Sequence, residues 1–340
     1  MKKYLLLAIL LFSTHSRAEE TATPSVAPHV MEGTDTYVTL DFLWWKTTMG
    51  AMEYATTGVI DGGRAVPIGK NTSEGRVQKA GFTFEPGIKF GMGMNFSHDG
   101  WDLYAEYTRL ASLNKSNSIA SSPGIGATNL YTYIPNQQVP LSSASCHWKQ
   151  TLSAAELTLG RDHFISPSLT MRPSAGLKTA WINEQSKISY VPLDTVNPAN
   201  PNSLETAVLL TYRQNMWGLG IKTALNVRWH LTKNWSFYND FAFSALWSDF
   251  HVHQKQNVSE TIYGQQTTLY TKETIKTVIP VFEGGGGISY IVWLDKSRYR
   301  FEFRGGWEEQ IWLDFNHYTK LGGTGNLAMQ GLTLKATLNF

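Results

Sequence analysis

Residues 81–96 read GFTFEPGIKFGMGMNF, and this stretch decides the fold class. Every even-numbered position holds an apolar residue, from Phe82 to Phe96, while the odd-numbered positions hold glycines, polar residues or charged residues. Sixteen residues of unbroken alternation predict a β-strand whose two faces meet different environments. Because Glu85 and Lys89 lie on the polar face, we expect one side of this strand to face apolar surroundings and the other to face charge.

The same alternation returns along the rest of the chain. It predicts further strands over residues 37–47, 101–110, about 148–164, 168–182, 215–231, 234–250, 275–293, 298–313 and 327–340, which makes ten strands in all. No stretch after residue 18 offers the roughly 20 continuous apolar residues that a membrane-spanning helix needs.

The connections between these segments alternate between two lengths. Four are tight turns, at 97–100, 166–167, 232–234 and 295–297, and five are long, at about 48–80, 112–146, 184–213, 251–274 and 315–326. Short turns at one rim and long loops at the other are typical of barrels of the bacterial outer membrane. The expected fold class is therefore all-β: a transmembrane antiparallel β-barrel of about ten strands, within a range of eight to twelve, with short periplasmic turns and long extracellular loops.

The N-terminus has the pattern of a secretory signal peptide. Lys2 and Lys3 precede an apolar run of nine residues, 4–12, and Ser16-Arg17-Ala18 supplies small residues at the two positions that signal peptidase reads. We expect cleavage near Ala18, a flexible periplasmic leader over 19–36 and a barrel over 37–340. The predicted location is the bacterial outer membrane.

Tryptophans gather where the predicted strands meet their connections, as expected for rings that prefer the two membrane interfaces. A girdle is predicted from Trp101, Trp229, Trp235 and Trp293 beside the short turns and from Trp44, Trp181, Trp217 and Trp247 at the long-loop ends. Trp45, Trp148 and Trp312 also lie at the long-loop ends, and Trp307 lies nearer mid-strand. The alternative, a secreted β-sandwich, would have exposed edges to protect and would rarely sort its tryptophans in this way.

Composition removes several classes of function. The chain has 340 residues, a formal net charge of +2, 16% charged residues and no basic tract, so a nucleic-acid partner is not expected. Its single cysteine, Cys146, excludes an internal disulfide framework and CxxC-type sites, although it leaves a link between two copies open. No motif calls for a cofactor or a metal.

The chain ends in residues 332–340, LTLKATLNF, which alternate strictly and place Phe340 last. This ending resembles the C-terminal signal that the barrel-insertion machinery recognises. Three further segments, GWDLYAEYTRL at 100–110, ELTLGR at 156–161 and LTMRPSAGLKTAWI at 169–182, resemble the Legionella major outer membrane protein family, members of which also occur in chlamydia-like bacteria. The resemblance implies a pore-forming outer-membrane barrel.

Charged residues on the face opposite the apolar one are candidates to line the lumen. These candidates are Asp41, Glu85, Lys89, Asp102, Glu106, Glu156, Arg172, Lys178, Lys222, Arg228, Arg300 and Arg304. Acids dominate the first four strands and bases the next two, which predicts an acidic wall opposite a basic wall and a transverse field across the lumen. Gly91, Gly93, Gly218 and Gly220 also point inward, where they would leave space.

Two outcomes remain open for this charged interior. Ten strands lie between the narrow barrels that side chains fill and the wide barrels that hold an aqueous channel. The charges therefore either line a narrow conducting pore or pair with one another and close it.

An enzyme is the less favoured class of function. Asp249 and His251 have the Asp-x-His spacing that orients an imidazole for general-base work, but both continue an outward-facing series. We expect a porin-like channel for ions and small polar solutes, with outer-membrane lipid, the insertion machinery and a possible second copy as partners. The alternative is a non-conducting structural or adhesive barrel that acts through its extracellular loops.

Overall fold

The computed structural model describes residues 35–57, 77–96, 100–119, 125–127, 141–192, 206–260, 266–295, 298–318 and 325–340. The predicted signal peptide, residues 1–18, and all but the last two residues of the predicted leader, 19–36, lie outside this part of the chain. Both remain predictions. No helix in the described residues is long and apolar enough to cross a membrane.

The described residues form ten long strands. They are β1 (Thr36–Met49), β4 (Phe84–Asn95), β5 (Trp101–Ile119), β7 (Leu141–Arg161), β9 (Leu169–Pro192), β10 (Thr206–His230), β11 (Trp235–Glu260), β12 (Gln266–Leu294), β13 (Tyr299–Asn316) and β14 (Gly325–Asn339). Four short strands accompany them: β2 (Glu53–Thr57), β3 (Val77–Lys79), β6 (Ile125–Ala127) and β8 (His163–Ser166).

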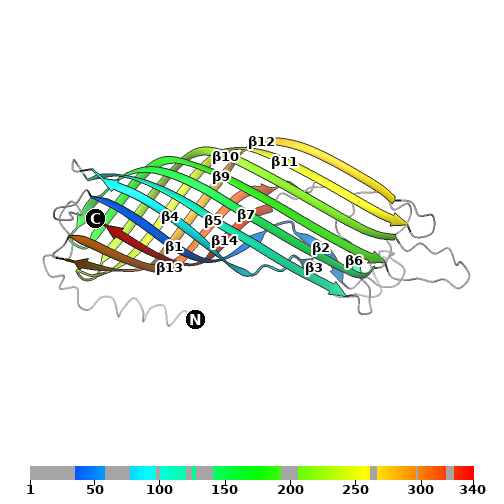
Figure 1. The fold of residues 1–340 in the computed structure, drawn as a ribbon, viewed down its shortest axis with the longest axis horizontal. Helices are drawn as coiled ribbons and strands as arrows, with labels where there is room; N and C mark the ends of the chain where they lie inside the picture. The colour runs from blue at the N-terminus through cyan, green and yellow to red at the C-terminus, as the bar shows by residue number, and fades with distance from the viewer. Residues whose placement is uncertain are drawn as a thin grey trace, which may run out of the picture.

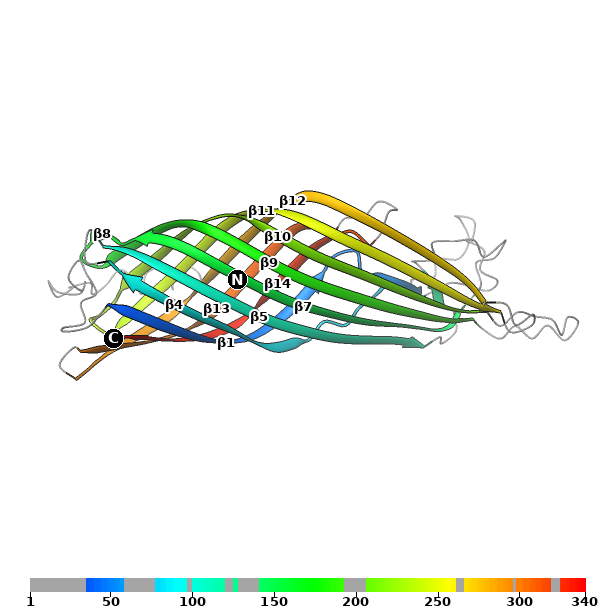
Figure 2. The same ribbon diagram turned by 45° about the horizontal axis from the view of Figure 1, so that its top comes forward.

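The ten long strands close into an antiparallel barrel (Figures 1 and 2). Each pairs with its neighbour along the chain, β7 pairs with β9 past the short β8, and β1 pairs with both β4 and β14. Thr36 and Phe340 complete the seam, because each backbone N–H donates to the other residue's carbonyl at 3.2 and 2.9 Å. The predicted fold class and the predicted number of strands are confirmed.

The outer face carries a continuous apolar band. Alternate side chains on the strands, such as Leu40, Met92, Ile221 and Val278, are more than half exposed on this outer face. Soluble proteins rarely expose a contiguous apolar surface of this extent, whereas lipid solvates it without cost. This band argues against the secreted β-sandwich.

Tryptophans border the band. All eight predicted girdle residues point outward and are between 38% and 69% exposed. Trp307 belongs with them, because it pairs in register with Leu332, which in turn pairs with Trp44 at the long-loop border.

Three other tryptophans do not belong to the border. Trp45, Trp148 and Trp312, which the sequence places at the long-loop ends, are fully buried inside the barrel and do not reach the membrane interface. Strand parity is the reason, since Trp45 follows the outward Trp44 and must point inward.

Two of the five predicted long loops are mostly strand. β9 continues to Pro192 and β10 begins at Thr206, within the predicted loop 184–213; β11 and β12 likewise occupy most of 251–274. Beyond the border the pattern inverts: apolar side chains such as Ile188 and Leu210 point inward, and polar ones such as Lys187 point outward. These strand ends therefore stand outside the membrane and enclose their own apolar core.

Candidate functional site in the barrel interior

The interior of the barrel has two halves. The half nearer the short turns holds charged side chains around a cavity of about 320 Å³. The half nearer the long loops is filled by packed apolar side chains. We call them the charged chamber and the apolar plug. Successive side chains of a strand point to opposite faces of the barrel wall. Where the outer face contacts lipid, the apolar residues point outward and the charged residues point inward; where the outer face contacts water, the apolar residues point inward.

Two lysines and two glutamates form a closed square at the centre of the barrel. Lys178, on β9, lies 2.8 Å from Glu156, on β7, and Lys222, on β10, lies 3.1 Å from Glu283, on β12. Each lysine also bonds to the other glutamate. All four side chains are at most 15% exposed. Each charge is thus shared between two opposite charges, so the group is electrically neutral.

A second group joins the opposite wall. Lys89 Nζ lies 2.7 Å from Glu308 Oε2 and 3.9 Å from Glu106 Oε1. Lys335 Nζ lies 3.4 Å from both Asp41 and Glu106. The group carries three acids and two bases, which gives it one excess negative charge.

Arginines take over toward the short turns. Arg172 clamps Asp102 through two nitrogens, Nε at 2.7 Å and Nη2 at 2.5 Å. Glu302 is shared by Arg228 at 3.0 Å, Arg300 at 3.0 Å and Arg304 at 2.7 Å. Arg304 also lies 3.9 Å from Asp240.

The charges therefore do not stand apart as two walls. Acids and bases pair across the interior, so the expected transverse field is largely cancelled at short range. Ten of the twelve predicted lumen residues line the cavity. Lys178 lies just outside the lining, 5.5 Å from the centre of the Trp312 ring, and Glu85 lies apart near the long-loop end, where it accepts a hydrogen bond from Thr83.

Sequence reasoning did not single out Glu283, Glu308 and Asp240, although each now has a cationic partner. Parity alone would have found them, since each lies on the face opposite the apolar residues of its strand. What parity cannot give is the pairing, because the partners come from strands far apart in the sequence.

The inward glycines do not leave an opening. A Cβ atom on Gly91 would lie 2.2 Å from the Tyr104 hydroxyl, and one on Gly93 would lie 2.2 Å from the Tyr37 ring. The two rings stack over these glycines with centroids 5.7 Å apart. Gly91 and Gly93 make room for tyrosines, so they narrow the chamber instead of widening it.

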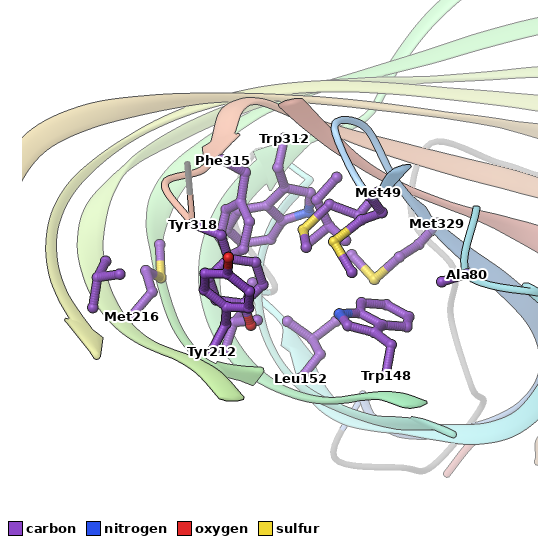
Figure 3. Packing of buried hydrophobic residues seen from close by; sticks show 14 of the residues in the cluster. Met49, Ala80, Trp148, Leu152, Tyr212, Met216, Trp312, Phe315, Tyr318 and Met329 are labelled. Atoms are coloured by element: carbon purple, nitrogen blue, oxygen red, sulfur yellow. The ribbon is translucent and has the colours of Figure 1, made fainter. Parts of the chain in front are cut away.

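The apolar plug fills the long-loop half of the barrel. Figure 3 shows Trp312, Phe315 and Tyr318 pointing across the interior toward Tyr212, Leu152 and Trp148. Trp148, Trp312 and Phe315 have no exposed surface. Lys89 and Lys178 contact the rings of Trp45 and Trp312 at 5.1 and 5.5 Å, so these rings form the boundary between plug and chamber.

Part of the plug comes from the end of β13 and the two residues that follow it. Near Asp314, whose φ is +53°, the register of β13 with β14 shifts, and in residues 315–318, the inward segment, the side chains of Phe315 and Tyr318 are buried in the plug. The side-chain amide of Gln214 holds this inward segment: its Nε2 donates to the Phe315 carbonyl at 3.0 Å and its Oε1 accepts from the His317 N–H at 2.9 Å. Gln214 thus satisfies backbone groups that would otherwise be buried without a partner.

Glu184 lies beside Gln214 in register, beyond Trp181 and outside the membrane-spanning part of β9. Its side chain is buried, and Gln214 Nε2 lies 3.4 Å from one of its oxygens. Burial raises the pKa of Glu184 to about 8. The group is therefore mostly protonated at neutral pH.

Two further sequence candidates have clear positions. Asp249 and His251 lie 3.9 Å apart on the outer face, away from the interior, as their parity predicts. Cys146 is buried in the plug next to Ser186, and burial raises the pKa of its thiol to about 11. No group of three or more metal-ligating side chains occurs in the described residues.

Comparison with known proteins gives one family. The family model described as "Legionella pneumophila major outer membrane protein precursor" matches residues 28–340. No curated protein matches the chain.

Several solved outer-membrane structures align over most of the chain. The "CymD monoaromatic hydrocarbon channel" aligns with 8% identity and a TM-score of 0.22, over 90% of this chain and 88% of that one. The P. putida toluene transporter TodX aligns with 8% identity and a TM-score of 0.25, over 90% and 89%. A loop-deletion mutant of OmpT from Vibrio cholerae aligns with 8% identity and a TM-score of 0.19, over 90% and 98%. The closed barrel itself follows from the strand pairing, independently of these alignments.

Proposed function

The chain belongs to the family of the Legionella pneumophila major outer membrane protein precursor, and from this premise we propose that it is a channel for passive diffusion of ions and small polar solutes. The family is a structural and transport family of the outer membrane and not an enzyme family. One observation carries the proposal: the closed barrel encloses a charged cavity of about 320 Å³.

The cost of burying charge supports this use of the chamber. A barrel that served only as a scaffold would gain more from a packed apolar interior, because buried ion pairs seldom recover the free energy of their desolvation. This chain builds such an apolar interior in its long-loop half but not in its membrane half. Charged side chains that face a hydrated cavity keep part of their solvation and offer polar solutes a favourable path.

The pairing of charges bears on which solutes would pass. The lysine–glutamate square is neutral, and the group around Lys89 and Lys335 carries one excess negative charge. A solute therefore meets both signs within a few ångströms of each other. We expect weak ion selectivity and passage of small polar solutes of either charge.

The apolar plug determines under which conditions solutes could pass through the barrel. Among the described residues, packed side chains without exposed surface fill the long-loop half in this conformation. Conduction then requires the inward segment to move, as in a channel with a hydrophobic gate. The same plug favours a second candidate function, a non-conducting barrel that acts through its extracellular loops.

Flux through reconstituted protein separates the two functions. The mature chain is placed in liposomes loaded with an impermeant sugar polymer, and swelling is followed after dilution into iso-osmotic solutions of a small neutral, a cationic and an anionic solute. A channel gives swelling rates that fall with solute size and differ little with solute charge. Liposomes that do not swell, although the barrel is folded, would favour the loop-based function.

Assembly is a separate proposal. Phe340 directly follows β14 at the short-turn rim with 40% of its surface exposed, which leaves it accessible at the periplasmic side. We propose that the insertion machinery recognises it during assembly, together with the alternating outward residues that precede it.

A further inference from the structure

The outer surface just beyond the long-loop girdle is strongly basic on one side of the barrel. It lies on β7, β9, β10, β11 and β12, and all its cationic side chains are exposed. We call it the basic collar and define it as Lys149, Lys187, Arg213, Lys255, Lys272 and Lys276.

Register brings these cations together across the sheet. Lys149 pairs with Gln185, which pairs with Arg213 on the next strand. Arg213 pairs with His253, which pairs with Lys272. The row therefore presents a cation on every second strand. Because neighbouring strands lie about 4.8 Å apart, the backbone positions of these cations are about 10 Å apart. A second row runs beside it, from Lys187 through Thr211 to Lys255.

Little negative charge balances this surface within the protein. Among the described outward-facing residues of these strands, Asp249 is the one acid, and it lies opposite Lys276 in register. Glu184 and Glu273 belong to the inward-facing side. The pKa of His253 is lowered by burial and by the nearby charges of Lys272, His251 and Arg213. The cations of each row are separated by one strand that carries a polar residue or a histidine, so their repulsion is moderate and an external anion placed between them would be attracted by several charges at once.

The height of the collar indicates which anion. Trp181, Trp217 and Trp247 mark the membrane border on these strands, and the collar begins within a few residues of them. Side chains at this level lie beside lipid headgroups. Phosphate fits the guanidinium of Arg213 and the ammonium groups that flank it.

We propose that the basic collar binds the phosphate groups of lipids in the outer leaflet. The collar lies on the outer face, so the interaction does not depend on conduction through the lumen. It would orient one side of the barrel toward phosphorylated lipid and hold β9 to β12 upright beyond the membrane.

Lipid binding to the full-length protein tests the proposal. The purified barrel in detergent is titrated with a diphosphorylated glycolipid, with the same glycolipid after removal of its phosphates, and with inorganic phosphate, and bound lipid is counted by native mass spectrometry. The variant R213Q/K272Q removes two collar charges. The control K233Q/R298Q removes two exposed charges at the opposite rim.

We expect the diphosphorylated lipid to bind the wild type and the control equally and the collar variant about thirtyfold more weakly, because the two basic residues removed each contribute about 1 kcal/mol near the surface. Inorganic phosphate should not displace it at equimolar concentration. Equal binding by the collar variant, equal binding of the dephosphorylated lipid, or full displacement by inorganic phosphate would each overturn the proposal.

Discussion

At the scale of single residues, Cys146 illustrates how the barrel hides a reactive group. Its thiol is fully buried in the plug, and its pKa is raised to about 11, so little thiolate forms at neutral pH. We expect no alkylation by a maleimide in the folded barrel and complete alkylation in urea, read by mass. Rapid labelling of folded protein, or a disulfide-linked dimer under oxidising conditions, would contradict this placement.

Glu302 is the residue on which the arginine group depends. Glu302→Gln removes the acid that Arg228, Arg300 and Arg304 share, and leaves Arg304 with Asp240 at 3.9 Å. Breaking a buried ion pair costs on the order of 3 kcal/mol, so the barrel should unfold at lower urea concentration. Its reversal potential in a salt gradient should also move toward anion selectivity.

The control for this change is Glu53→Gln, which alters a pair with Lys79 (2.9 Å) away from the chamber. This variant also removes one negative charge, but the charge lies outside the chamber. Its ion selectivity should therefore equal that of the wild type. If both variants shift the reversal potential equally, the arginine group does not face the conducting path.

At the scale of elements, the inward segment 315–318 is a part of the plug that extends beyond a strand, because β13 ends at Asn316. Gln214→Ala removes the two hydrogen bonds that hold its backbone and leaves a buried carbonyl and a buried N–H without these partners. Each unsatisfied group costs roughly 1–3 kcal/mol. We expect the variant to open more often in single-channel records, with the neighbouring outward Gln185→Ala unchanged.

Protonation of Glu184 should couple the plug to pH. Its pKa rises from an ordinary value of 4.5 to about 8 on folding, so the folded plug binds a proton that the open chain releases between these values. Stability of the plug is therefore full below about pH 4.5, falls as pH rises to about 8, and is constant above. Hydrogen exchange of residues 315–318 should quicken across this window.

Glu184→Gln provides the comparison, because it keeps the shape and cannot titrate. Exchange in this variant should not change with pH once the intrinsic chemical rate is removed. If the corrected hydrogen-exchange rate of the wild type also does not change with pH, the Glu184 carboxylate is either accessible to solvent or stabilised by a partner in its ionised form.

The strands within the membrane could be predicted from the sequence because lipid imposes one rule on the outer face. Residues 81–96 obey it throughout, and β4 runs from Phe84 to Asn95. The strand ends outside the membrane were missed because water reverses the rule there. Ile188 points inward and Lys187 points outward, so this part of β9 lacks the outward apolar residues that identify a membrane strand. The sequence there therefore resembles a polar loop.

The interior was predictable in content but not in arrangement. Parity identified Glu156, Lys178 and Lys222 as inward, yet their square with Glu283 requires strands β7, β9, β10 and β12 to meet across the barrel. The arrangement of the plug likewise depends on contacts between residues far apart in the sequence. No local pattern shows that Phe315 turns inward, because its partner Gln214 is 101 residues away.

At the scale of the whole molecule, two solvents shape one barrel. Within the membrane the outer face is apolar and the interior charged; beyond the membrane the outer face is polar and the interior apolar. The charged chamber and the apolar plug therefore lie in series along the barrel, and we propose that the plug acts as a gate. A single barrel of this kind should conduct in discrete events, because the gate is either packed or displaced.

Single-channel recording of the reconstituted mature protein in a planar bilayer, with a salt gradient across it, tests this account most directly. We predict discrete conductance steps separated by closed intervals, and a small reversal potential because the chamber's charges are paired. A correctly folded barrel that stays silent, in the wild type and in Gln214→Ala alike, would contradict the channel and place the function in the extracellular loops.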